Sequence, residues 1–68
     1  MHDISINLYR TFCIVAQSKS YADASNKLHI STTAISKNIK QLETLLETKL
    51  FYREKDGLKL TGAGQEFF

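Results

Sequence analysis

The strongest pattern in this sequence is an apolar spacing of four, three and four residues in the middle of the chain. The stripe consists of Ile35, Ile39, Leu42 and Leu46. Residues at this spacing lie on one face of an α-helix, so the pattern predicts a helix that buries the stripe and takes Ser31 as its N-cap. The opposite side of that helix carries short polar and basic residues, namely Thr33, Ser36, Lys37 and Lys40, with Thr32 at the border.

Two shorter helices are predicted before this one. Leu8, Phe12 and Val15 form an amphipathic stripe, which indicates a helix from about Ile6 to Gln17 with Ser5 as its N-cap. Ser20 and Asp23 then have the spacing of a capping box, which predicts a second helix of about two turns that ends near Leu28. A tight turn at residues 29–31 joins this helix to the long one.

After the long helix, the period changes to that of strands. Residues 50–53 and 58–60 flank the segment Glu54-Lys55-Asp56-Gly57, which predicts a β-hairpin with an Asp-Gly turn. Thr61 can cap a fourth helix over residues 62–68. The predicted fold class is therefore all-α with a small β-hairpin: a winged helix-turn-helix over residues 1–60, with a three-helix core and a two-stranded wing, followed at 61–68 by the start of a linker helix. We expect that helix to continue in a longer parent protein.

Length and composition exclude several classes of protein. A chain of 68 residues buries only about 60% of its surface on folding, so a deep catalytic cleft is not expected. No nucleophile, base and orienting residue can be grouped, and we expect no enzymatic activity. One cysteine, Cys13, with two histidines supports neither an internal disulfide nor a structural zinc site, so no metal or cofactor is expected. The apolar runs are far shorter than the roughly 20 residues of a membrane span and no signal peptide precedes them, which predicts a cytoplasmic protein.

The polar side of the long helix suits duplex DNA. A helix fits the major groove, about 12 Å wide, when its groove-facing side chains are short, as Thr32, Thr33 and Ser36 are. Thr and Ser can hydrogen-bond to base edges or phosphates, a Thr methyl can touch a thymine methyl, and lysines can reach guanine or phosphate. The formal net charge of +2 is too small to indicate this partner alone. The predicted DNA-binding residues are Ser31, Thr32, Thr33, Ser36, Lys37 and Lys40 in the helix region, and Arg53 and Lys59 in the hairpin.

In order and spacing, these residues resemble the N-terminal DNA-binding domain of LysR-type bacterial transcriptional regulators. The likeness covers nearly the whole chain and is carried by residues 12–16, 20–21, 24, 28–31, 34–37, 39, 42–43, 50–51, 53 and 60–64. Thr32 and Thr33 stand where that family usually has Gln and then Pro or Ser, and Lys19 and Glu47 stand where it often has Gly.

The resemblance implies a dimeric, or higher oligomeric, regulator that binds double-stranded DNA. It implies that Ser36, Lys37 and Arg53 contact DNA. It also implies that the helix beginning at Thr61 continues as a dimerisation and linker helix, with Ala63, Phe67 and Phe68 as the first residues of its apolar stripe. That helix would lead to a C-terminal domain, absent from this sequence, through which a small-molecule effector acts.

Other interpretations remain open from the sequence. Glu43 and Glu47 make the predicted long helix electrically neutral as a whole. An alternative function therefore stays open, in which the winged helix is a protein–protein interaction module. Glu43 could also pair with Lys40 or with Arg10. Tyr9 and Tyr21 are interpreted as aromatic residues of the core or its edge.

Overall fold

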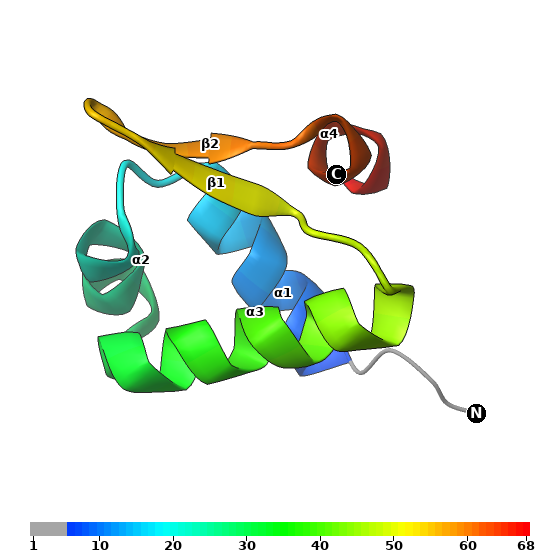
Figure 1. The fold of residues 1–68 in the computed structure, drawn as a ribbon. Coiled ribbons are helices and arrows are strands. Elements are labelled where there is room, and N and C mark those ends of the chain that lie inside the picture. Colours follow the sequence, from blue (N-terminus) through cyan, green and yellow to red (C-terminus); the bar gives the residue numbers. More distant parts are fainter. Residues whose placement is uncertain (1–5) are drawn as a thin grey trace.

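The computed structural model describes residues 6–68 and shows four helices and one antiparallel hairpin within them (Figure 1). In chain order the elements are α1 (Ile6–Ala16), α2 (Tyr21–Leu28), α3 (Thr32–Leu46), β1 (Phe51–Glu54), β2 (Gly57–Leu60) and α4 (Gly62–Phe67). This architecture confirms the predicted winged helix-turn-helix. None of the described helices is both long and apolar enough to cross a lipid bilayer. The predicted N-cap Ser5 lies outside the described residues.

The starts of α2 and α3 are fixed by hydroxyl caps. Ser31 accepts a hydrogen bond from the Ala34 N–H (3.0 Å), as predicted. Ser20 likewise accepts from the Asp23 N–H (3.1 Å), but the Asp23 carboxylate accepts from the Lys19 N–H (3.0 Å), one residue before the position that a capping box uses. This hydrogen bond lowers the pKa of the Asp23 carboxyl below its ordinary value.

A single core holds the three helices and the hairpin together. Its fully buried side chains include Phe12 from α1, Ile35, Ile39 and Leu42 from α3, and Leu50 before β1. The Phe12 ring lies 5.5 Å from the Phe51 ring and 5.1 Å from the Phe67 ring, between centroids. Phe12 therefore ties α1 to both the wing and α4.

The hairpin turn lies one residue earlier than predicted. Glu54 pairs with Gly57, so the loop is Lys55-Asp56 and Gly57 opens β2 with a φ of 132°. A Cβ atom at Gly57 would lie 2.9 Å from the Lys19 carbonyl oxygen. The glycine is therefore needed for the approach of β2 to the α1–α2 loop. The predicted hairpin and its Glu54–Gly57 turn segment are confirmed, but the central pair of the turn is Lys55-Asp56 and not Asp56-Gly57.

Cross-strand pairing sorts the wing residues onto two faces. Phe51 pairs with Leu60 and Arg53 with Leu58, so these four lie on one face, whose three apolar members pack on the core. Tyr52 pairs with Lys59 on the opposite, outer face. Figure 1 shows the hairpin tip on the side of the molecule where α2 lies, and α4 at the other end of the strands.

A second set of contacts closes the base of the wing onto the end of α3. Glu43 Oε2 accepts a hydrogen bond from the Leu50 N–H (2.7 Å), and Glu43 Oε1 lies 3.9 Å from Lys49 Nζ. The Thr61 hydroxyl donates to the Lys49 carbonyl (2.7 Å) and accepts from the Gly64 N–H (3.0 Å). We call Glu43, Lys49, Leu50, Thr61 and Gly64 the closing seam. Glu43 thus bonds within this seam rather than to the sequence-based candidates Lys40 or Arg10.

Candidate nucleic-acid interface

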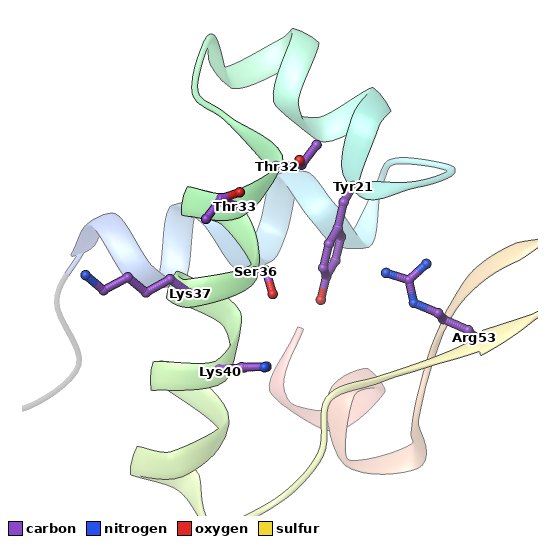
Figure 2. Close-up of a pocket in the computed structure, with 7 residues that line it drawn as sticks. All are labelled: Tyr21, Thr32, Thr33, Ser36, Lys37, Lys40 and Arg53. Carbon is purple, nitrogen blue, oxygen red and sulfur yellow. The ribbon is translucent and has the colours of Figure 1, made fainter.

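A shallow concavity opens between the first half of α3, the start of α2 and strand β1 (Figure 2). We call its lining the basic face: Tyr21, Thr32, Thr33, Ser36, Lys37, Lys40 and Arg53. All of these except Tyr21 were predicted DNA-binding residues. The charged groups of the basic face are cationic, and no Asp or Glu lines it.

The burial of the apolar stripe is what turns the polar residues of α3 outward. Ile35 and Ile39 are fully buried, and the side chains on the opposite side of the same turns must then face solvent. Thr32, Thr33, Lys37 and Lys40 are exposed and Ser36 is half-buried. Over residues 6–68, no hydrogen bond or ion pair of the chain engages these five side chains. They are free to bind an external partner.

Arg53 reaches the basic face from the inner face of the wing. Its guanidinium carbon lies 5.4 Å from the centroid of the Tyr21 ring, within the range of a cation–π contact. In Figure 2 the Tyr21 hydroxyl points into the space between Ser36 and Arg53. Burial and the Glu43 charge raise the pKa of the Tyr21 phenol, against a smaller lowering by Arg53. The phenol is therefore protonated at neutral pH and can donate a hydrogen bond.

Tyr21 is the residue of this face that sequence reasoning missed. Its place at the start of the apolar side of α2 suggested an aromatic residue of the core or its edge, and the structure leaves it half-buried. The sequence did offer one indication that Tyr21 lies at a polar surface: a tyrosine hydroxyl needs a polar partner or water even when its ring is packed. The contact with Arg53 joins residues far apart in the sequence, and local patterns do not reveal it.

Two predicted DNA-binding residues lie outside the basic face. Ser31 is exposed next to it, with its side-chain oxygen engaged in capping α3. Lys59 lies on the outer face of the wing, opposite Tyr52, with its ammonium 3.7 Å from an Asp56 carboxylate oxygen. The structure therefore does not bring Lys59 together with Arg53.

The residues predicted for dimerisation lie on α4 or, for Phe68, at its C-cap, and they differ in exposure. Ala63 is half-buried, and the Phe67 ring packs edge-on against Tyr9 at 5.4 Å between centroids. Phe68 leaves 52% of its surface exposed, and Ile6 on α1 leaves 83%. Phe67 thus contributes to the chain's own core, while Phe68 keeps apolar surface open.

The two halves of α3 differ in charge and in accessibility. Glu43, in the second half, keeps its carboxylate in the closing seam, where only 12% of its side chain is exposed. Lys37 and Lys40, in the first half, form no ion pair within residues 6–68. The structure ends α3 at Leu46 with Glu47 as its C-cap, so the helix holds Lys37, Lys40 and Glu43 and is not neutral as predicted. Its positive charge lies unpaired in the first half. The described residues also contain no cluster of His, Cys, Asp and Glu side chains that could hold a metal ion.

Comparison with known proteins identifies similar chains. A family model described as "Bacterial regulatory helix-turn-helix protein, lysR family" matches residues 6–65. The RuBisCO operon transcriptional regulator of Allochromatium vinosum is 40% identical over 68 residues, which is 100% of this chain and 22% of that protein. The chain thus spans about a fifth of that relative's length.

Similar solved structures include two complexes with DNA. The crystal structure of a CbnR DBD–DNA complex matches with a TM-score of 0.86 and 32% sequence identity, covering 93% of this chain and 72% of that one. The crystal structure of a BenM DBD/benA site 1 DNA complex matches with a TM-score of 0.86 and 30% identity, covering 93% of this chain and 73% of that one.

Proposed function

This chain belongs to the lysR family of bacterial regulatory helix-turn-helix proteins, and from that premise we propose that it binds duplex DNA as the sequence-reading head of a transcriptional regulator. The observation that carries the proposal is the basic face, whose α3 hydroxyls and ammonium groups have no partner within residues 6–68. Two solved relatives of the same fold are described as DNA complexes, which supports this assignment.

In the proposed mechanism, the first half of α3 enters the major groove. Thr32, Thr33 and Ser36 are short enough to let the helix backbone approach the base edges. Their hydroxyls can donate to or accept from bases, and the threonine methyls can contact the methyl group of thymine. Lys37 and Lys40 extend further and can reach guanine acceptors or neutralise phosphates.

The wing contributes contacts outside this groove. Arg53 faces the same side as α3 and suits an adjacent minor groove or the flanking backbone. Ser31, at the edge of the basic face, suits a phosphate contact. Lys59 would contact only DNA phosphates, which carry no sequence information. Its ammonium would first have to leave Asp56.

We also propose that the functional unit is a homodimer, or a higher homo-oligomer, built through α4 and its continuation. The apolar surface left open at Phe68 and the half-buried Ala63 and Phe67 support this role. Two heads would then meet half-sites spaced by whole turns of the duplex, about 34 to 36 Å or a multiple. We propose that a small-molecule effector acts through a domain outside this sequence and that the protein works in the cytoplasm. We assign the chain no catalytic role.

The test is a titration of a fluorescein-labelled, mixed-sequence duplex with this protein at several salt concentrations, read by fluorescence anisotropy. The logarithm of the association constant should fall linearly with the logarithm of salt concentration, by about 0.9 per phosphate neutralised. Lys37→Ala should reduce that slope by about one. Lys49→Ala removes an equal charge in the closing seam and should leave the slope unchanged.

Two outcomes would contradict the proposal. Equal slope reductions in both lysine variants would show that the basic face is not the binding site. A folded sample that fails to bind at low salt would favour the alternative of a protein–protein interaction module.

A further inference from the structure

The contact between the wing and α2 supports an inference that rests on the proposed function and deepens it. We propose that Tyr21 is a positioning residue, which holds the Arg53 guanidinium at the edge of the basic face so that the wing meets DNA from a fixed place. In this view the ring from α2 and the cation from β1 act as one unit.

The geometry of Arg53 supports this pairing. Its guanidinium carbon lies 5.4 Å from the Tyr21 ring centroid, and its side chain forms no ion pair within residues 6–68. The charge of Glu43 raises the pKa of Tyr21, but the Glu43 carboxylate accepts a hydrogen bond from the Leu50 N–H and forms an ion pair with Lys49. The aromatic ring is therefore the contact that orients Arg53 in the free protein.

The backbone around the pair keeps the ring and the strand in register. The Leu58 N–H donates a hydrogen bond to the Lys19 carbonyl (3.4 Å), and Leu58 is the cross-strand partner of Arg53. Gly57 admits the same carbonyl at close range, since a side chain there would clash with it. The wing is thus attached to the loop that leads directly into Tyr21.

Orienting Arg53 before binding reduces the side-chain entropy that is lost when the protein binds DNA. A long exposed arginine ordinarily loses rotamer freedom when it meets a phosphate or a minor groove. Stacking on Tyr21 restricts that freedom in the free protein, and arginine stacks well because its guanidinium is planar. We therefore expect the contribution of Arg53 to affinity to depend on the aromatic ring at position 21.

A double-mutant cycle tests this dependence. DNA affinity is measured by anisotropy for the wild type, Tyr21→Leu, Arg53→Ala and the double variant. Tyr21→Leu should weaken binding by about 2- to 5-fold, the range of an exposed cation–π contact, and should have no further effect once Arg53 is alanine. Tyr21→Phe keeps the ring, so it should lose less affinity than Tyr21→Leu and should keep the coupling to Arg53→Ala.

Tyr52→Leu provides the matched control. Tyr52 is the neighbour of Arg53 in β1, but its ring lies on the outer face of the wing. This variant should show no coupling to Arg53→Ala. Thermal unfolding of each variant separates a loss of affinity from a loss of folded protein.

A second readout needs no DNA. In the free protein, the Arg53 side-chain protons should show ring-current shifts in NMR spectra that disappear in Tyr21→Leu and persist in Tyr21→Phe. Additive effects in the cycle, or equal losses in Tyr21→Phe and Tyr21→Leu, would overturn the positioning role while leaving DNA binding intact. Absence of binding by the folded wild type would instead contradict the proposed function itself.

Discussion

The basic face and the closing seam are built from similar side chains and use them in opposite ways. Both contain threonine and lysine. In the seam, the Thr61 hydroxyl bonds to Lys49 and Gly64. On the basic face, the Thr33 hydroxyl and the Lys37 ammonium bond to nothing within residues 6–68. The role of a polar group in this domain therefore follows from its partners rather than from its residue type.

This difference has an energetic basis. A buried donor that loses its acceptor costs about 1 to 3 kcal/mol, so seam residues are constrained by folding. An exposed hydroxyl or ammonium keeps its water shell and contributes little to folding. We therefore expect seam variants to lose stability while the folded fraction binds DNA normally, and basic-face variants to lose affinity or specificity at unchanged stability.

The largest effect should come from Gly64→Ala. A Cβ atom at this position would lie 2.3 Å from the Leu50 carbonyl oxygen and 2.8 Å from Leu60 Cδ2, so α4 must shift away from the wing. We expect a loss of about 3 kcal/mol in unfolding free energy, measured by urea denaturation. Gly62→Ala is the matched control, because a Cβ atom there meets nothing within 4 Å. Equal stability of the two variants would contradict the tight approach at Gly64.

Removal of the seam carboxylate should have a slightly smaller effect. Glu43→Ala leaves the Leu50 N–H without its acceptor, and we expect a loss of about 1 to 3 kcal/mol in chemical denaturation. Glu43→Gln retains an acceptor oxygen and should recover most of that stability. If glutamine destabilised as much as alanine, the charge beside Lys49 would matter more than the hydrogen bond.

On the basic face, Ser36→Ala should change sequence preference without changing stability. If the hydroxyl touches a base, discrimination at one position should fall by about 1 to 3 kcal/mol, measured against a panel of single-base operator variants selected with the wild type. Thr33→Ser offers a finer version, because it removes only a methyl group. Its effect should vanish when the contacted thymine is replaced by uracil. A uniform loss across all sequences would assign these residues to phosphate contacts.

The smallest effect concerns Asp23, whose carboxylate is hydrogen-bonded like a seam residue but is only half-buried. The Lys19 N–H lowers the pKa of its carboxyl in the folded state. Its contribution to stability is therefore present above the unfolded-state pKa and is lost as the pH falls through the lower folded-state pKa. Asp23→Asn should be less stable than the wild type at neutral pH, and the two unfolding curves should converge in acid. A constant difference at all pH values would exclude this carboxylate as the cause.

The parts of this molecule that were predictable from sequence are those fixed by local spacing. The stripe from Ile35 to Leu42 and the caps Ser20 and Ser31 depend on neighbours within one or two turns, and the structure confirms them. The winged helix-turn-helix fold followed from the order of such elements.

The errors share a different physical origin. Gly57 was placed in the central pair of the turn because Asp-Gly pairs favour turns, whereas it opens β2 and its conformation allows a close approach to Lys19. Glu43 was matched to charged side chains, whereas its main partner is a backbone N–H. Tyr21 and Arg53 meet only after the wing has folded back onto α2. Contacts of this kind carry no periodic signature in a single sequence.

The hydrogen bonds of Thr61 close the base of the hairpin, so this base does not depend on the length of the wing. Lys49 and Gly64 are bound by one hydroxyl, and the Thr61 N–H also donates to the Leu50 carbonyl (3.0 Å), so the base of the hairpin is secured without its tip. Residues inserted at Lys55-Asp56 would extend the reach of the hairpin along a duplex while leaving the base intact. The length of this loop can therefore change without disturbing the closing seam.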